Sequence, residues 1–230
     1  MAGTLGEMAE DVRIDRSGGS GVSALIEEAA APVALSVVAH GAGADMRTSI
    51  LDGVSAGLVA QAVSCLRFNF PYAEAGRRGP DRPPALLDTW RSALDAAPRW
   101  SGDLPIVAGG KSLGGRIASM LAAEMGGAFP AAALIFFGYP LHAPGRPDRP
   151  RDAHLFDVSV PMLFIQGTSD PLARFDLIQT LVHRLSGRAT LHVVEGGDHS
   201  FRLRGARRPD EEIGRELGAA AAAFARDIVG

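Results

Sequence analysis

The stretch Gly109-Gly110-Lys111-Ser112-Leu113-Gly114-Gly115 lies between a short apolar run at residues 105–108 and a helix-forming segment at 113–124. Its centre fits the pattern G-x-S-x-G, in which small residues on both sides of the serine let a strand and a helix meet at a sharp turn. Such a turn lifts the serine hydroxyl above the carboxyl end of the strand, beside the positive end of the helix. We therefore predict that Ser112 is a nucleophile in a strand–turn–helix elbow. An ordinary glycine-rich turn is the alternative interpretation.

A phosphate-binding P-loop competes with this interpretation because Lys111 and Ser112 follow a glycine. That motif needs another glycine five residues before its G-K pair. Position 105 is proline, so the pattern favours the elbow.

Short apolar runs alternate with longer helical segments along most of the chain. The predicted strands are residues 34–39, 64–70, 105–108, 131–137, 160–166 and 190–194. The predicted helices are residues 49–62, 84–96, 113–124, 175–185 and 211–229. The strand runs are almost continuously apolar, as is typical of strands buried on both faces of a parallel sheet. We predict an α/β protein with a doubly wound, mostly parallel sheet that is flanked by helices.

The sequence also predicts the domain organisation. Residues 1–20 are rich in glycine and are expected to form a flexible tail, with a short edge strand around 12–14. A single domain is expected at 21–230. The loop at 139–157 is rich in proline and charge, and it is too short for a lid domain, so we expect a minimal lid.

The composition excludes several classes of protein. Apolar residues make up 47% of the 230, which is enough for a sizeable core and too many for a disordered chain. The net charge of −3 argues against a dedicated binder of nucleic acid or of anionic membranes. The single cysteine, Cys65, excludes an intrachain disulfide and a cysteine-rich zinc site. Without a membrane-length apolar run or a secretory signal, the chain is expected to be cytoplasmic.

Two further polar residues follow predicted strands. Asp170 comes after the strand at 160–166, and His199 comes after the strand at 190–194. The carboxyl ends of parallel strands meet at one edge of the sheet, so both side chains are expected near Ser112. In this arrangement Ser112 attacks, His199 takes its proton, and Asp170 orients the imidazole.

These residues also have structural interpretations. Asp170 is followed by proline, which is typical of a turn or of a helix start. Asp198 is adjacent to His199 and cannot easily reach the far side of its ring, so we interpret it as part of the loop. Four other histidines lack such a loop after a strand and are expected to be surface or packing residues: His142, His154, His183 and His192.

The loop that begins at His40 follows the strand at 34–39. We expect the backbone N–H of Gly41 or Ala42 to form one half of an oxyanion hole, and the N–H of Leu113 to form the other. Two such donors lower the barrier by about 3 kcal/mol each. For His40 itself, a structural role in supporting this loop is favoured over a direct role in proton transfer.

Four side chains near the predicted strand ends are candidate substrate contacts: His40, Tyr72, Lys111 and Tyr139. Lys111 is next to the nucleophile and fits either recognition of an acidic group or pairing with a nearby carboxylate. Tyr139 follows the strand at 131–137 and is expected at the floor of an acyl pocket.

Two arginine-rich loops, at 77–82 and 202–208, each allow two interpretations. The first fits recognition of an anion by Arg77 or Arg78, and the second fits steering of an acidic substrate or partner. Self-paired, solvated loops are the favoured interpretation of both.

Five segments in this order resemble the α/β-hydrolase superfamily: His40-Gly-Ala-Gly-Ala-Asp45, Leu66-Arg-Phe-Asn-Phe-Pro-Tyr72, Gly110-Lys-Ser-Leu-Gly-Gly-Arg116, Gln166-Gly-Thr-Ser-Asp-Pro171 and Gly197-Asp-His-Ser-Phe201. They are most similar to compact bacterial hydrolases related to testis-expressed protein 30 and to a chromatin-complex subunit domain, a branch akin to dienelactone hydrolases. The resemblance covers about residues 32–229. It implies an α/β-hydrolase fold in which Ser112, Asp170 and His199 match the triad positions. Dienelactone hydrolases usually carry a cysteine where this chain has Ser112.

Together these patterns predict a serine hydrolase that cleaves a carboxylic ester through an acyl-enzyme on Ser112. A thioester or an amide is a further candidate substrate. No metal or cofactor is predicted, and the expected partner is a small-molecule substrate rather than nucleic acid or a membrane. A non-catalytic binding or scaffold module of the same fold is the alternative. A cofactor-free haloperoxidase or a peptidase would use the same three residues.

Overall fold

The computed structural model describes residues 9–230. Within them, eight strands form one sheet: β1 (Glu10–Arg16), β2 (Gly19–Glu27), β3 (Ala34–Ala39), β4 (Val63–Phe68), β5 (Ile106–Lys111), β6 (Ala133–Phe137), β7 (Met162–Gly167) and β8 (Ala189–Val194). Their order across the sheet is β1-β2-β4-β3-β5-β6-β7-β8. β2 is antiparallel to both of its neighbours, and all other neighbouring strands are parallel. The predicted doubly wound, mostly parallel sheet is confirmed.

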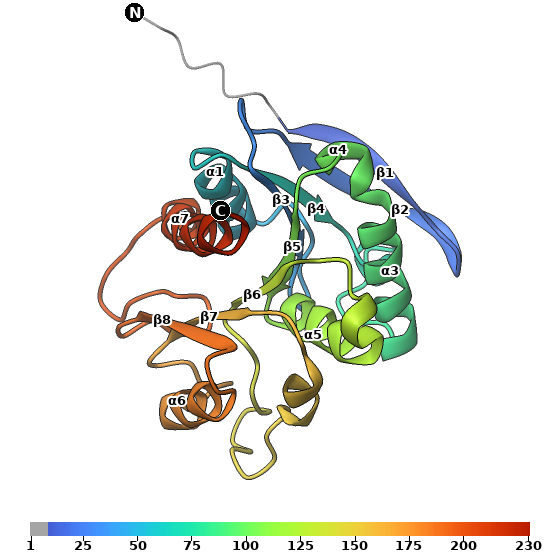
Figure 1. Ribbon diagram of the computed structural model, residues 1–230. Helices are drawn as coiled ribbons and strands as arrows, with labels where there is room; N and C mark the ends of the chain where they lie inside the picture. The colour runs from blue at the N-terminus through green and yellow to red at the C-terminus, as the bar shows by residue number, and fades with distance from the viewer. Residues whose placement is uncertain (1–8) are drawn as a thin grey trace, which may run out of the picture.

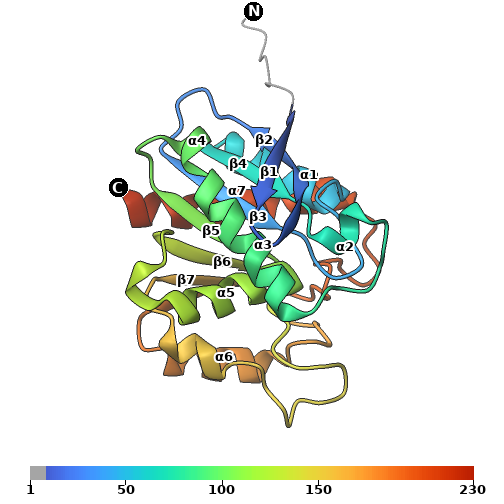
Figure 2. The ribbon, with the colours of Figure 1, turned by 90° about the vertical axis from the view of Figure 1, so that its right-hand side faces the viewer.

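Helices cover both faces of this sheet (Figures 1 and 2). The longer ones are α1 (Ser49–Val59), α3 (Pro83–Ala96), α5 (Leu113–Met125), α6 (Phe175–Arg184) and α7 (Asp210–Val229). α1 and α7 lie on one face, and α3, α5 and α6 lie on the other. Short helices are α2 (Pro71–Glu74) and α4 (Pro98–Ser101), with single 3₁₀ turns at Gly126–Ala128 and Ala153–Asp157. All residues of β3, β4, β6 and β7 are buried, which explains why the strand runs are almost continuously apolar.

The N-terminal region differs from the expectation of a flexible tail over 1–20. β1 pairs with β2 in an antiparallel hairpin, and β2 joins the hairpin to β4. The physical reason is a partly alternating pattern: Ile14 and Val22 face the core between exposed or half-buried neighbours, and residues 24–26 of β2 are all buried. The part of the expected tail at residues 1–8 lies outside the described residues.

α1 and α7 pack unusually closely because glycines line both helices where they meet. A Cβ on Gly57 would lie 2.3 Å from the carbonyl oxygen of Arg215, and one on Gly218 would lie 2.2 Å from that of Val54. Both obstacles are backbone atoms, which cannot turn aside as a flexible side chain can. This contact fixes α1, whose first turn borders the candidate site described below.

We expect the substitution Gly57→Ala to lower the free energy of unfolding by about 2 kcal/mol, because the added methyl group must push the two helices apart. Urea unfolding followed by circular dichroism measures this change. The matched control is Gly127→Ala, because a Cβ on Gly127 has no atom within 4 Å. The free energy of unfolding of that control should stay within about 0.5 kcal/mol of the parent value. Equal stability of the two variants would contradict the close packing.

None of the helices within residues 9–230 has the length and apolar character needed to span a membrane.

Candidate active site

Ser112 stands at the turn between β5 and α5, with φ of 50° and ψ of −109°. This left-handed region is strained for a residue with a side chain, so the surrounding structure must hold it. A Cβ on Gly110 would lie 2.3 Å from the carbonyl oxygen of Ala39, and one on Gly114 would lie 2.4 Å from the same atom. Glycine at both positions therefore lets β3 and α5 come close enough to hold the turn, as the elbow interpretation requires.

The side chains of Ser112, His199 and Asp170 form a continuous hydrogen-bonded chain. His199 Nε2 lies 2.9 Å from Ser112 Oγ, and His199 Nδ1 lies 2.7 Å from Asp170 Oδ2. Because the ionised carboxylate only accepts, Nδ1 carries the proton and Nε2 is free to accept the serine hydroxyl. The Asp170 side chain is fully buried, whereas 23% of the His199 side chain is exposed. The three loops thus bring a hydroxyl, a base and an acid together, as the sequence predicted.

Asp170 is held by two further donors. Gln166 Nε2 donates to Asp170 Oδ2 over 2.6 Å, and the backbone N–H of Leu172 donates to Oδ1 over 2.8 Å. The same glutamine accepts the backbone N–H of Tyr139 through Oε1 over 2.9 Å, which ties the end of β6 to the acid. Gln166 is completely buried. The sequence analysis did not predict this role of Gln166, although a polar residue near the end of the apolar strand β7, four positions before Asp170, is a signal that could have indicated it.

The loop that carries His199 is closed by its neighbour Asp198. Asp198 Oδ1 accepts the backbone N–H groups of Ser200 and Arg202 over 2.8 and 2.9 Å. Asp198 therefore shapes the turn while Asp170 orients the imidazole. Phe201 follows in the left-handed region, with φ of 63°, and its ring is buried.

The predicted oxyanion loop lies beside Ser112. Within residues 9–230, the N–H groups of Gly41 and Ala42 have no hydrogen-bond acceptor. The N–H of Leu113 is in the first turn of α5 and has no partner within the helix. These three donors are the ones that the sequence predicted.

His40 and Tyr72 stand behind this loop. Phe70 N–H donates to His40 Nε2 over 3.1 Å, so the ring proton is on Nδ1, which lies 2.9 Å from the carbonyl oxygen of Gly41. Burial lowers the pKa of His40 and keeps it neutral. The Tyr72 hydroxyl donates to the same carbonyl over 2.9 Å, and burial raises its pKa to about 12. Both side chains therefore fix the direction of the Gly41 peptide.

A pocket of about 330 Å³ opens over Ser112 and His199. It is bounded by the β3 loop, the start of α1 and the loops after β7 and β8, through Gly41, Ala42, Ala44, Thr48, Ile50, Leu51, Leu172 and Ser200. Lys111 also lines it. The volume is at the low end for small-molecule sites.

Comparison with known proteins gives the family of this fold. A sequence model described as the alpha/beta hydrolase domain matches residues 32–228. The chain belongs to the alpha/beta hydrolase family. No group of three or more side chains placed to ligate a metal occurs in the described part of this alpha/beta hydrolase.

Solved structures share the fold of this alpha/beta hydrolase at low sequence identity. A serine hydrolase of Xanthomonas campestris, described as having no lid, is 18% identical, with a TM-score of 0.74 over 97% of this chain and 98% of that one. The esterase domain of a Rhodothermus marinus protein is 17% identical, with a TM-score of 0.72 over 97% and 100% of the two chains. A dienelactone hydrolase from Anabaena variabilis is 18% identical, with a TM-score of 0.72 over 96% of each chain.

Three of the four candidate substrate contacts do not border the pocket. His40, Tyr72 and Tyr139 are fully buried, and only Lys111 of the four lines it. Tyr139 turns under the 139–157 loop, where its hydroxyl donates to the carbonyl oxygen of Arg151 over 2.9 Å. Its ring packs against Phe136 and Phe164, with centroids 5.2 and 5.6 Å away. The expectation that Tyr139 floors an acyl pocket is therefore corrected: it anchors the loop.

A second serine–histidine contact lies behind the elbow in this alpha/beta hydrolase. Ser119 Oγ is 2.8 Å from His154 Nε2, and it also lies 2.8 Å from the carbonyl oxygen of Arg116. Ser119 is completely buried on α5, so no substrate reaches it. Burial, with the nearby Arg116, lowers the pKa of His154 to about 4. This pair ties the 139–157 loop to α5.

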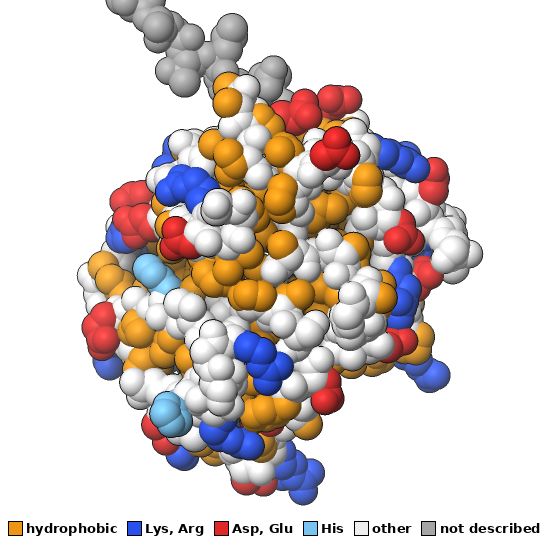
Figure 3. All heavy atoms as spheres, viewed as in Figure 1, with side chains coloured by type: hydrophobic (Ala, Val, Ile, Leu, Met, Phe, Trp, Pro, Cys, Tyr) orange, Lys and Arg blue, Asp and Glu red, His pale blue; other side chains and the backbone are white. Residues whose placement is uncertain are grey.

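Three of the seven arginines in the two arginine-rich loops form ion pairs with nearby acids. Arg77 pairs with Asp81, Arg202 with Asp210, and Arg208 with Glu212 and Glu216. On the face seen in Figure 3, blue and red side chains are likewise interspersed. These pairs favour the interpretation of both loops as self-paired and solvated.

Proposed function

We propose that this alpha/beta hydrolase is a serine hydrolase that cleaves a carboxylic ester through an acyl-enzyme on Ser112. The observation that carries the proposal is the hydrogen-bonded chain from Ser112 Oγ through His199 to the buried carboxylate of Asp170. Ser112 and His199 line an open pocket, next to three backbone N–H groups that have no acceptor within residues 9–230.

The reaction proceeds in two halves. In the first, Ser112 Oγ attacks the carbonyl carbon while His199 Nε2 takes the hydroxyl proton, and the Asp170 carboxylate stabilises the imidazolium that forms. The tetrahedral intermediate then collapses, His199 gives the proton to the leaving alcohol, and the acyl group stays on Ser112. In the second, water attacks the acyl-enzyme with His199 again as the base, which releases the acid and restores Ser112.

The negative charge on the tetrahedral oxygen is bound by backbone donors. The Leu113 N–H at the start of α5 supplies one of them, and Gly41 or Ala42 supplies the other. His40 and Tyr72 act indirectly, because they hold the Gly41 carbonyl and thereby the direction of the neighbouring N–H groups.

Trapping the acyl-enzyme tests this mechanism. We expect p-nitrophenyl acetate to give a burst of nitrophenol, and acid quenching to leave one acetyl group on the peptide that contains Ser112. Peptide mass spectrometry locates the group. Turnover with the acetyl group on another residue would contradict the proposal.

The pocket favours short or exposed acyl groups. It holds only about 330 Å³, and the 139–157 loop is anchored to α5 instead of extending into a lid. We therefore expect kcat/KM to be highest for acetyl to butyryl esters and to fall about tenfold or more for decanoyl esters. A panel of p-nitrophenyl esters measures this series. A strong preference for long chains would contradict it.

Several finer expectations belong to the same proposal. A small-molecule substrate, a cytoplasmic location and a single domain fit the sequence patterns above. The closer resemblance to the branch of testis-expressed protein 30 rests on the five quoted segments. Thioester or amide cleavage is tested by adding those substrates to the panel. The non-catalytic scaffold remains the alternative, and a folded protein that never acylates would favour it.

A further inference from the structure

The segment at the end of β4 holds the start of the oxyanion loop, which comprises residues 40–46. β3 and β4 are parallel neighbours that end at the same level of the sheet, so the segments that follow them lie next to each other. Phe70 donates its backbone N–H to His40, and the Tyr72 hydroxyl donates to the carbonyl oxygen of Gly41, as described above. The direction of the chain where it leaves β3 is therefore set by β4.

The same segment also holds the far end of the loop, at Met46. Asn69 Oδ1 accepts the backbone N–H of Met46 over 2.8 Å, and Arg67 Nη1 donates to the Met46 carbonyl oxygen over 3.1 Å. Met46 itself is buried. Two side chains from the end of β4 thus hold one residue of the loop from both sides of its backbone.

The middle of the loop carries the free donors. The N–H of Ala44 donates to the carbonyl oxygen of Gly41 over 3.4 Å, and Gly43 has φ of 72°, so the chain turns back on itself here. The N–H groups of Gly41 and Ala42 have no acceptor within residues 9–230. A short loop with a turn in its middle and both ends held has few conformations open to it. The contacts at the two ends therefore set the direction of these N–H groups.

Arg67 joins the oxyanion loop to two other elements. Its side chain is only 2% exposed, and its guanidinium pairs with Glu27 of β2 and with Asp52 of α1. The distance from Nη1 to Asp52 Oδ1 is 2.5 Å, and the same Nη1 donates to Met46. One planar group thus fixes β2, α1 and the loop relative to one another.

The ion pairs of Arg67 are a costly way to stabilise the fold. Taking charges out of water costs free energy that their attraction often only offsets, so that well-packed apolar side chains do as well. Arg67 Nε is also buried without a hydrogen-bond partner, which adds to the cost. What arginine adds over an apolar side chain is a rigid fork of donors with defined directions. Its particular contribution here is therefore the geometry of its contacts.

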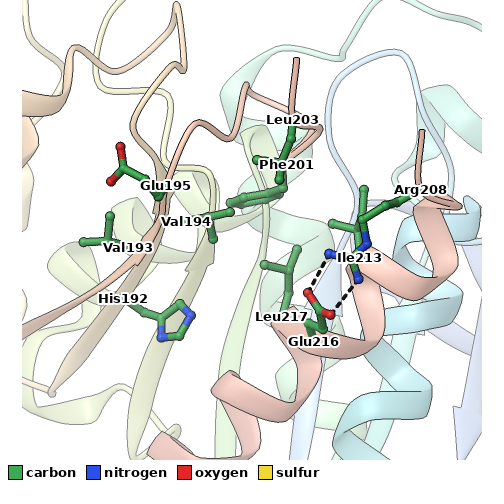
Figure 4. A pocket seen from close by; sticks show the side chains of 10 residues that line it. All are labelled: His192, Val193, Val194, Glu195, Phe201, Leu203, Arg208, Ile213, Glu216 and Leu217. Atoms are coloured by element: carbon green, nitrogen blue, oxygen red, sulfur yellow. Dashed lines mark hydrogen bonds and ion pairs between the residues drawn. The ribbon is translucent and has the colours of Figure 1, made fainter. Parts of the chain in front are cut away.

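Two other paired arginines lack a connection to the active site. Arg16 is 6% exposed and pairs with Asp88 of α3 over 2.7 Å. Arg208 pairs with Glu216 of α7 over 2.6 Å, beside a second pocket of about 310 Å³ between α7 and β8 (Figure 4). Within residues 9–230, no hydrogen bond or ion pair joins either side chain to the oxyanion loop. Arg16 is thus a buried, paired arginine that can serve as a control for Arg67.

We propose that Arg67 and Asn69 are positioning residues for the oxyanion hole. They hold Met46 from both sides and, together with the contacts at the other end of the loop, make the end of β4 a template for residues 40–46. Neither side chain lines the pocket over Ser112, so both act on the reaction only through the loop. This inference rests on the proposed serine hydrolase function.

The substitution Arg67→Met tests the contact with the Met46 carbonyl. Loss of one oxyanion donor lowers kcat about 10²- to 10³-fold, and a misdirected donor costs part of that. We therefore expect kcat for p-nitrophenyl acetate to fall about 30-fold, with KM changed less than about threefold. The matched control, Arg16→Met, should change kcat less than about threefold. Equal losses of kcat in the two variants, or a loss confined to KM, would overturn the inference.

A second variant covers the case in which Arg67→Met does not fold because Glu27 and Asp52 lose their partner. The triple variant Glu27→Gln, Asp52→Asn, Arg67→Met removes both negative charges together with the arginine. We expect it to fold, as circular dichroism would show, and to lose kcat by about the same 30-fold factor. A folded triple variant with the kcat of the parent would count against the proposal.

The substitution Asn69→Ala tests the other side of Met46. It leaves the Met46 N–H without its acceptor, and we expect kcat to fall about tenfold. The matched control is Ser23→Ala. Ser23 Oγ donates to Glu74 Oε2 over 3.0 Å, and Glu74 Oε1 accepts from Asn69 Nδ2 over 2.8 Å, so this control removes the next link and keeps the contact with Met46. Its kcat should change less than about twofold. A larger loss in Ser23→Ala than in Asn69→Ala would contradict the role of the Met46 contact.

A transition-state analogue measures the oxyanion hole separately from the amount of active enzyme. The ketone 1,1,1-trifluorobutan-2-one forms a bond from its carbonyl carbon to Ser112 Oγ; the π electrons of the carbonyl move to its oxygen, and His199 takes the hydroxyl proton. The resulting oxyanion uses the same backbone donors as the ester intermediate. We expect the inhibition constant to rise about 30-fold in Arg67→Met and about tenfold in Asn69→Ala, in step with the loss of kcat. A merely structural defect lowers the active fraction and leaves the inhibition constant unchanged, and that result would overturn the inference.

The two levels of the account fail in different ways. If the parent enzyme forms no acyl-enzyme on Ser112, the proposed function fails. If it does, and the inhibition constants of Arg67→Met and Asn69→Ala equal that of the parent, only the inference on these two residues fails.

Discussion

The substitution Ser112→Ala should lower kcat for a short ester by about 10⁵-fold, because it removes the atom that forms the acyl-enzyme. His199 and Asp170 stay in place in this variant, and the backbone donors still bind the carbonyl oxygen. KM should therefore change by less than about fivefold. Steady-state kinetics with p-nitrophenyl acetate measures both constants.

The matched control for this prediction is Ser169→Ala. Ser169 is an exposed serine directly before Asp170, and the side chain takes no part in the hydrogen-bonded chain. Its loss should change kcat by less than about twofold. Comparable losses in the two variants would mean that the Ser112 hydroxyl has no special role.

The substitution Asp170→Asn should lower kcat by about 10⁴-fold, although the two side chains have nearly the same shape. Asp170 Oδ2 accepts from both His199 Nδ1 and Gln166 Nε2, and Oδ1 accepts from the Leu172 N–H, so the NH₂ group of an asparagine must face either the first two donors or the third. If the donor faces His199, the ring proton moves to Nε2 and points at Ser112 Oγ. The histidine then cannot accept the serine proton.

Asp198→Asn is the informative control for Asp170→Asn. The amide oxygen of asparagine still accepts the N–H groups of Ser200 and Arg202, as Asp198 Oδ1 does in the parent. We therefore expect kcat to fall less than about tenfold in this variant. A larger loss in Asp198→Asn than in Asp170→Asn would reverse the roles assigned to the two acids.

The elbow and the three loops were predictable because each depends on local rules. Glycine is required at 110 and 114 because a Cβ there would lie 2.3 and 2.4 Å from the carbonyl oxygen of Ala39. β5 and β7, which precede the elbow and the Asp170 loop, are almost entirely buried and therefore have apolar sequences. β8, which precedes the His199 loop, is an edge strand with no fully buried residue. Since parallel strands end at one edge, their order along the chain was enough to bring Ser112, Asp170 and His199 together.

Side-chain direction was not predictable from the same patterns. A position after a strand places Tyr139 at the right edge of the sheet, but packing against Phe136 and Phe164 turns its ring away from the pocket. Gln166 was missed because its role depends on two partners from different loops, Asp170 and the backbone of Tyr139. An edge strand was expected around 12–14, where β1 lies, but β2 and its pairing with β1 were missed because glycines interrupt the alternating pattern at Gly18, Gly19 and Gly21.

A fluorophosphonate probe tests the central claim most directly, because it reacts only with a serine that a nearby base has activated. We expect the folded parent protein to be labelled on one peptide, the one that contains Ser112, and Ser112→Ala to remain unlabelled. Labelling that persists undiminished in Ser112→Ala, or a folded parent that does not react, would contradict the account.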